Sequence, residues 1–234
     1  MTPTAGAEEA ITRGPAPLID HTLLKADATA AAIDALCDEA ARFGFAAVCV
    51  NPVRVRAAAE RLRGTTVATC AVVGFPLGAL TAGMKRDEAV GVIADGAREI
   101  DMVMNVGALK SADPMAVLLD IEAVTAAAAE AGAPVKVIIE AALLTEEEKV
   151  AACVLARGGG AAWVKTSTGF GPGGAVAADV RLMRQVVGDT MGIKAAGGIR
   201  RYAELLGMVD AGATRIGTSA GPEIMKEWKR QAAR

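Results

Sequence analysis

Short apolar runs alternate with longer amphipathic stretches along most of the chain. Eight runs of five to seven residues have the composition of buried β-strands, and they begin 21 to 36 residues apart. The runs are 18–22, 46–50, 67–73, 99–105, 135–140, 161–166, 192–197 and 213–217. This spacing leaves room for one helix after each strand.

The stretches between the runs carry helical signals. Residues 29–44 show an apolar stripe at helical spacing and end at Gly44, a residue that commonly terminates helices. Residues 113–132 begin with Asp113, a good N-cap, followed by Pro114 at the first helical position. Both stretches are therefore predicted to be helices.

Eight strand–helix units in a chain of 234 residues are typical of one fold. They predict an α/β protein that folds as a (β/α)8 TIM barrel, with a single domain over residues 18–234. Residues 1–17 are expected to form a short N-terminal tail. An open doubly wound sheet is the alternative architecture.

Composition and charge limit the partners. The net charge is −2 and no basic run occurs, so neither a nucleic-acid nor a membrane partner is predicted. Residues 64–84 carry no charge, but a Gly- and Pro-containing loop at 74–78 divides them and a helix is expected to start at Thr81. We therefore predict no membrane span here.

The cysteines and the histidine argue against disulfides and zinc. Four cysteines are widely spaced, three of them lie in apolar segments, and His21 is the only histidine. This pattern predicts reduced, buried thiols in a cytoplasmic protein that has no metal site.

Polar residues gather where the predicted strands end, which is where a barrel of this type places its chemistry. Lys165 and Lys194 each lie in an otherwise apolar strand and are one strand–helix unit apart, so neighbouring strands would carry them. Two ammonium groups about 4 Å apart repel by about 4 kcal/mol at an effective dielectric constant of about 20, which favours a neutral amine. A neutral amine attacks carbonyl carbon and forms a Schiff base, and Asp101 could carry the protons.

The alternative for each lysine is a charged group that reaches the rim or forms a salt bridge. Lys136 is a contrast, because it stands at the start of its strand and is expected at the opposite, stability face.

Glycine-rich turns follow the last two predicted strands. Gly197, Gly198 and Gly217, with the Ser219 hydroxyl and the Arg200 side chain, could hold a phosphate group through backbone amides. The alternative is that these glycines only form turns. Residues 169–174 match a dinucleotide-binding pattern, but a proline interrupts it and the expected acidic residue is missing, so no dinucleotide is predicted.

Taken together, these stretches resemble deoxyribose-phosphate aldolases, from about Leu18 to Gly221. The resemblance rests on IDHTLL, VCVNP, VVGFPLG, EIDMVMNVG, VKVIIE, WVKTSTGF, GIKAAGGIR and RIGTSAG, which stand in the order of the family. It implies a class I aldolase, without metal or other cofactor, that reversibly cleaves 2-deoxy-D-ribose 5-phosphate to acetaldehyde and D-glyceraldehyde 3-phosphate.

The resemblance also implies roles for individual residues. Lys165 matches the Schiff-base lysine, Lys194 the second lysine and Asp101 the relay carboxylate. The residues implied to bind substrate are Asp20, Thr22, Cys49, Thr168, Gly197, Gly198, Arg200, Gly217 and Ser219. A homodimer or higher homo-oligomer is expected by the same resemblance.

Three positions depart from some relatives. Phe170 stands where some have a phosphate-binding lysine, Ala220 stands where some have a second serine, and the chain ends without the terminal tyrosine of others. Two rival hypotheses remain: another Schiff-base lyase with a different donor, and a silent barrel that only binds a sugar phosphate.

Overall fold

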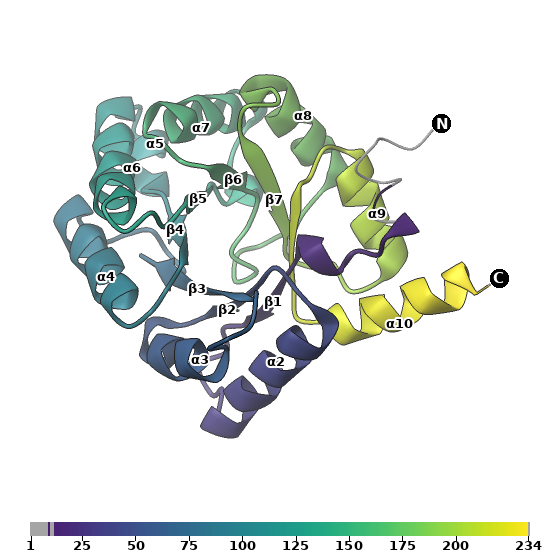
Figure 1. Ribbon diagram of the computed structural model, residues 1–234. Coiled ribbons are helices and arrows are strands. Elements are labelled where there is room, and N and C mark those ends of the chain that lie inside the picture. The colour runs from purple at the N-terminus through teal and green to yellow at the C-terminus, as the bar shows by residue number, and fades with distance from the viewer. Residues whose placement is uncertain (1–8, 10–11, 234) are drawn as a thin grey trace.

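The computed structural model describes residue 9 and residues 12–233, and it shows a ring of strands enclosed by helices (Figure 1). Eight parallel strands pair in chain order, and the last pairs with the first, so the barrel is closed. The strands are β1 Ile19–Leu23, β2 Ala47–Val50, β3 Ala68–Val73, β4 Glu99–Val103, β5 Val135–Ile138, β6 Trp163–Lys165, β7 Gly192–Ala196 and β8 Arg215–Thr218. The predicted (β/α)8 barrel is confirmed, and the open sheet is wrong because β8 pairs with β1.

The helices form the outer layer (Figure 1). They are α2 Ala30–Phe43, α3 Val55–Arg61, α4 Ala82–Ala94, α5 Val106–Lys110, α6 Pro114–Ala129, α7 Glu146–Gly158, α8 Ala177–Val187, α9 Tyr202–Asp210 and α10 Gly221–Ala232, with short 3-10 turns at Ala16–Leu18, Pro52–Arg54 and Ala141–Leu143. Helix α2 ends at Gly44 in the left-handed conformation, and the Asp113 side chain accepts a hydrogen bond from the Ala116 amide at the start of α6. Both predicted helices are thus confirmed. No helix among the described residues is long and apolar enough to cross a membrane.

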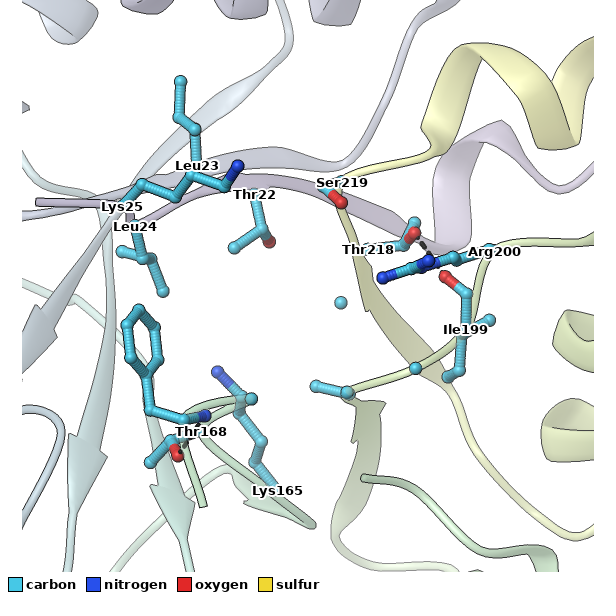
Figure 2. A pocket seen from close by; sticks show the side chains of 16 residues that line it. Thr22, Leu23, Leu24, Lys25, Lys165, Thr168, Ile199, Arg200, Thr218 and Ser219 are labelled. Atoms are coloured by element: carbon cyan, nitrogen blue, oxygen red, sulfur yellow. Dashed lines mark hydrogen bonds between the residues drawn. The ribbon is translucent and has the colours of Figure 1, made fainter. Parts of the chain in front are cut away.

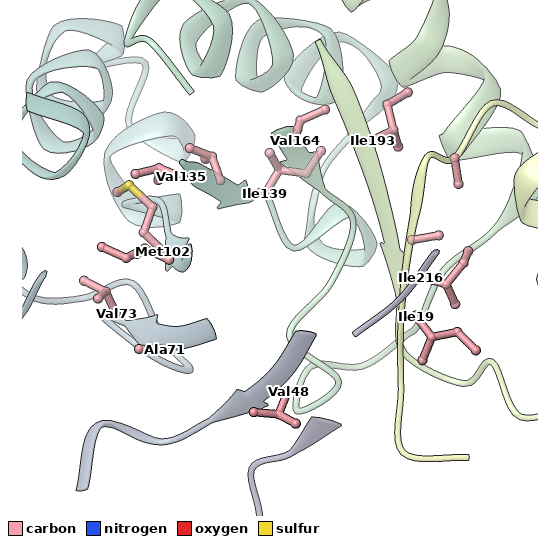
Figure 3. Packing of buried hydrophobic residues seen from close by; sticks show 14 of the residues in the cluster. Ile19, Val48, Ala71, Val73, Met102, Val135, Ile139, Val164, Ile193 and Ile216 are labelled. Carbon is pink, nitrogen blue, oxygen red and sulfur yellow. The ribbon is translucent and has the colours of Figure 1, made fainter. Parts of the chain in front are cut away.

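The main hydrophobic core lies between the strands and the helices (Figure 3). Successive strand residues point to opposite faces of the sheet, so Ile100 and Met102 pack outward while Glu99 and Asp101 point into the barrel. A barrel interior is usually filled with branched apolar side chains. Here charged side chains occupy part of it, beside a small cluster of Leu24, Ala47, Cys49, Cys70 and Val72.

Trp163, the first residue of β6, packs against residues of β7 and β8. The Arg215 guanidinium lies 5.3 Å from the centre of the Trp163 ring, and a Cβ atom at Gly192 would lie 2.0 Å from that ring. Glycine at this position therefore makes room for the indole.

Part of the expected N-terminal tail is packed. Gly14 to Ala16 are buried, and a Cβ atom at Gly14 would lie 2.9 Å from the Trp228 ring of α10. Residues 1–8, 10 and 11 of that segment lie outside the described residues.

Candidate active site

Lys165, the last residue of β6, stands at the floor of a cavity of about 370 Å³ at the C-terminal end of the barrel (Figure 2). Its side chain is 3% exposed, and Nζ lies 2.7 Å from Oδ2 of Asp101 on β4. The apolar strand thus holds a lysine because a buried carboxylate pairs with it, while its amine still faces the cavity.

Lys194 meets the same carboxylate from β7. Its Nζ lies 2.6 Å from Asp101 Oδ2 and 2.5 Å from Asp20 Oδ2. Lys165 and Lys194 are directly opposite each other in the register of β6 and β7, as the sequence predicts. The amines of Lys165 and Lys194 both bond Asp101 Oδ2, at 2.7 and 2.6 Å, so the two nitrogens cannot be farther apart than the sum of these distances.

The electrostatic balance differs from the expectation of two lysines that simply repel each other. Burial lowers the pKa of Lys194, but attraction to Asp101 and Asp20 outweighs it, so this pKa lies above its ordinary value. Burial raises the pKa of Asp101, but the lysines around it hold that pKa well below its usual range. Asp101 therefore stays an anion, and its attraction for Lys194 is a contribution that a picture of two repelling lysines leaves out.

Lys136 corrects the prediction from sequence. It was expected at the stability face, but its side chain is fully buried in the barrel interior, with Nζ 2.9 Å from Asp101 Oδ1 and 2.6 Å from Glu99 Oε2. The prediction is wrong because Lys136 pairs with Asp101 in the register of β4 and β5 and its long side chain reaches that carboxylate. Glu99 and Arg215 were also missed, although each stands two residues before a selected inward position, Asp101 or Gly217.

Most of the other predicted residues form the cavity wall. Those that line it are Thr22, Thr168, Gly197, Gly198, Arg200, Gly217 and Ser219. Asp20 and Cys49 do not line it: both are fully buried beneath it, and Cys49 Sγ lies 3.8 Å from Asp101 Oδ2. They were expected to line the pocket, but they lie one layer below its wall. Lys25 was missed and lines the rim of the cavity.

The loops that follow β7 and β8 are shaped for close approach by a ligand. Gly197 and Gly198 have φ angles of 91° and 82°, which side chains rarely adopt. The Thr218 hydroxyl donates to the Ile199 carbonyl at 2.6 Å and so ties the two loops together. Bare backbone at these positions can present amides to an anion.

Glu140, just beyond β5, is a further residue at this end of the barrel. It is buried and has a φ of 49°, an unusual conformation for a residue with a side chain. Its carboxylate accepts hydrogen bonds from the amide and the hydroxyl of Thr168, and a Cβ atom at Gly171 would lie 2.8 Å from it. Glu140 therefore fixes the loop that follows Lys165.

Three described residues could offer ligands to a metal. Cys49, Cys70 and Asp101 place ligand atoms within 4.8 Å of one another. A cation there would face the three lysine amines that bond Asp101, so its electrostatic environment is unfavourable. All four cysteines are buried and form no disulfide, as predicted.

Comparison with known proteins gives a consistent result. The model of the DeoC/LacD family of aldolases matches residues 16–226. A deoxyribose-phosphate aldolase of Streptococcus pneumoniae (serotype 19F, strain G54) is 60% identical over 208 residues, which cover 89% of this chain and 94% of that protein. The tetrameric structure of deoxyribose phosphate aldolase from Aeropyrum pernix is similar with a TM-score of 0.89 at 32% identity, covering 98% of this chain and all of the other.

Proposed function

Because the chain belongs to the DeoC/LacD family of aldolases, we propose that it cleaves 2-deoxy-D-ribose 5-phosphate through a Schiff base on Lys165. The products are acetaldehyde and D-glyceraldehyde 3-phosphate, and the reaction is reversible. The observation that carries the assignment is the arrangement at the cavity floor, where Asp101 Oδ2 bonds both Lys165 and Lys194. The two amines and the carboxylate thus form one continuous hydrogen-bonded unit, which supports a role for Lys165 as the nucleophile.

The proposed steps follow from that unit. The neutral Lys165 amine attacks the aldehyde carbon C1 of the open-chain sugar, and loss of water gives the iminium ion. Removal of the proton from the C3 hydroxyl breaks the C2–C3 bond, releases glyceraldehyde 3-phosphate and leaves an enamine. Protonation at C2 and hydrolysis then release acetaldehyde, and we assign the proton transfers to Asp101 and Lys194.

We place the phosphate group of the substrate at the loops after β7 and β8. Support comes from the positive φ angles of Gly197 and Gly198 and from Ser219 in the cavity wall. Lys25 and Arg200 line the same cavity and can add positive charge, whereas Phe170 cannot.

The nucleophile is tested by trapping. Treatment with acetaldehyde and borohydride should fix a two-carbon adduct on the peptide that contains Lys165, as read by mass spectrometry. Lys165→Leu should abolish turnover and trapping while the circular dichroism spectrum stays that of the wild type. An adduct on another lysine alone, or retained turnover in the variant, would refute the assignment. Trapping of a keto-acid or ketose donor in place of acetaldehyde would favour the rival Schiff-base lyase.

We further propose a homo-oligomer. The Aeropyrum pernix relative is described as tetrameric, and Met84 on α4 and Met115 and Leu119 on α6 are more than half exposed. Exposed apolar groups on adjacent helices are typical of a surface that binds a second copy. Light scattering should give a multiple of 23.7 kDa. Leu119→Glu should lower that mass, and Val154→Glu on α7 should not. A monomeric wild type would refute this proposal.

The four reduced, buried thiols support a cytoplasmic location, which we propose on that ground.

A further inference from the structure

Three charged side chains complete a ring beneath the two lysines of the site. Arg215 Nη1 lies 2.7 Å from Asp20 Oδ1 and 3.2 Å from Glu99 Oε2. Lys136 Nζ lies 2.6 Å from Glu99 Oε2 and 2.9 Å from Asp101 Oδ1. Lys194 joins Asp20 and Asp101, so these contacts close a ring in which cations and carboxylates alternate. Lys136 Nζ also lies 3.8 Å from Asp20 Oδ2, across the ring.

The charges of this ring cancel. Its anions are Asp20, Glu99 and Asp101, and its cations are Lys136, Lys194 and Arg215. Lys165 bonds the ring from above, through Asp101 alone, and is not a member of it. A protonated Lys165 therefore adds one unbalanced positive charge to a buried, neutral cluster, whereas a neutral amine adds none. Burying net charge is costly, so the ring favours the neutral form that attacks a carbonyl.

We infer that Glu99 and Arg215 are positioning residues of the reaction, which act on the charge of Lys165 through the ring and touch no substrate. This inference rests on the proposed function, because it takes Lys165 as the nucleophile. A purely structural role is a poor account of the ring: buried ion pairs seldom stabilise a protein more than apolar side chains of the same volume would. Most barrels fill this region with apolar groups.

Other titratable groups contact Asp101 or the loop after Lys165, or line the same cavity as Lys165. Besides the ring members they are the thiols of Cys49 on β2 and Cys70 on β3, the Glu140 carboxylate beyond β5, and the rim cations Lys25 and Arg200. Burial raises the pKa of Cys70 well above its usual range, so this thiol adds no charge near neutrality. Glu140 bonds the loop after Lys165 through Thr168 and has no contact with the ring among the interactions described above.

The inference predicts opposite effects for the two residues. The acid limb of kcat/KM against pH reports the group that must lose a proton before attack. Glu99→Gln removes an anion of the ring, disfavours the protonated amine and should move this limb to lower pH. Arg215→Gln removes a cation and should move it to higher pH. Each shift should be on the order of one pH unit, as expected for a unit charge several ångströms away at an effective dielectric constant of about 20. The double variant restores neutrality and should return the limb to its wild-type position.

Charge-conserving variants separate an effect of charge from an effect of packing, which matters if Glu99→Gln or Arg215→Gln folds poorly. Glu99→Asp and Arg215→Lys alter packing but keep the charge, so their acid limbs should match the wild type even if their rates fall. Lys149 and Asp179 form a partly buried pair between α7 and α8, and Lys149→Gln should leave the limb unchanged. The inference would be overturned if Glu99→Gln and Arg215→Gln shifted the limb in the same direction, or if neither shifted it. It would also be overturned if the charge-conserving variants shifted the limb as much as the neutral variants do. A missing Lys165 adduct in the wild type would instead overturn the proposed function.

Discussion

Replacing Lys194 with methionine removes one of the two amines that bond Asp101 Oδ2 and keeps much of the side-chain volume. The two amines lie 2.7 and 2.6 Å from that oxygen, so they are about 5 Å apart or closer. Two unit charges at about 5 Å repel by about 3 kcal/mol at an effective dielectric constant of about 20, which corresponds to about 2 pH units. Without Lys194, the acid limb of Schiff-base formation should therefore move up by about 2 pH units, and the rate near pH 7 should fall by about 100-fold.

Proton transfer adds a second loss, which pH can separate from the first. The electrostatic part should recover as pH rises toward 10, because the amine then loses its proton without help. The part due to the missing relay amine should persist at every pH. Turnover in Lys194→Met should thus stay below that of the wild type at alkaline pH, even where trapping has recovered.

The assay is the rate of borohydride trapping of acetaldehyde, followed by mass spectrometry from pH 6 to 10, together with kcat/KM on the phosphorylated sugar. Lys149→Met, which removes a lysine from an ion pair that does not line the cavity, is the control and should behave as wild type. Trapping by Lys194→Met at the wild-type rate at pH 7 would refute the view that Lys194 favours the neutral form of Lys165.

Four further predictions concern the cavity and the buried carboxylates. Phe170→Lys adds a cation at the cavity wall and should lower KM for deoxyribose 5-phosphate severalfold with little change on free deoxyribose; equal changes on both sugars would contradict it. Gly198→Asp should raise KM for the phosphorylated sugar alone by tenfold or more. Gly64→Asp is the matched control for backbone strain, because Gly64 has a φ of 84° and Gly198 has a φ of 82°. Glu140→Ala should release the loop after Lys165 and lower the free energy of unfolding by about 1 to 3 kcal/mol, with part of the loss restored in Glu140→Gln; a urea titration without a shift would contradict it. Burial raises the pKa of Asp20, but the surrounding cations lower it to about 2, so this group gives stability that is present above its ordinary pKa of about 3.8 and is lost as pH falls toward 2. Asp20→Asn should flatten the unfolding free energy over that range by about 2 kcal/mol, and an unchanged slope would contradict the assignment.

The repeated pattern of the chain determined the barrel. Each of the eight apolar runs is a strand of the closed sheet, with ends shifted by at most two residues. The prediction succeeded because strand and helix periods are local properties, and because eight strand–helix units of this length have few compact arrangements.

The sequence also predicted which residues gather at the cavity of the candidate site. Lys165 ends β6 and Lys194 lies in the neighbouring strand β7, and the parallel register sets them side by side. The glycine turns at 197–198 and at 217 lie at the same end of the barrel, since all strands run in one direction. Position along a strand was sufficient to find these residues.

Only the tertiary structure revealed the charges beneath them. Asp20 and Arg215 are 195 residues apart in sequence and meet because β8 pairs with β1. Lys136 stands near the start of its strand, yet it bonds Asp101 because the register of β4 and β5 places the two residues opposite each other. Closure of the sheet, its register and the reach of long side chains decide such contacts, and none of these follows from the spacing of residues along one strand.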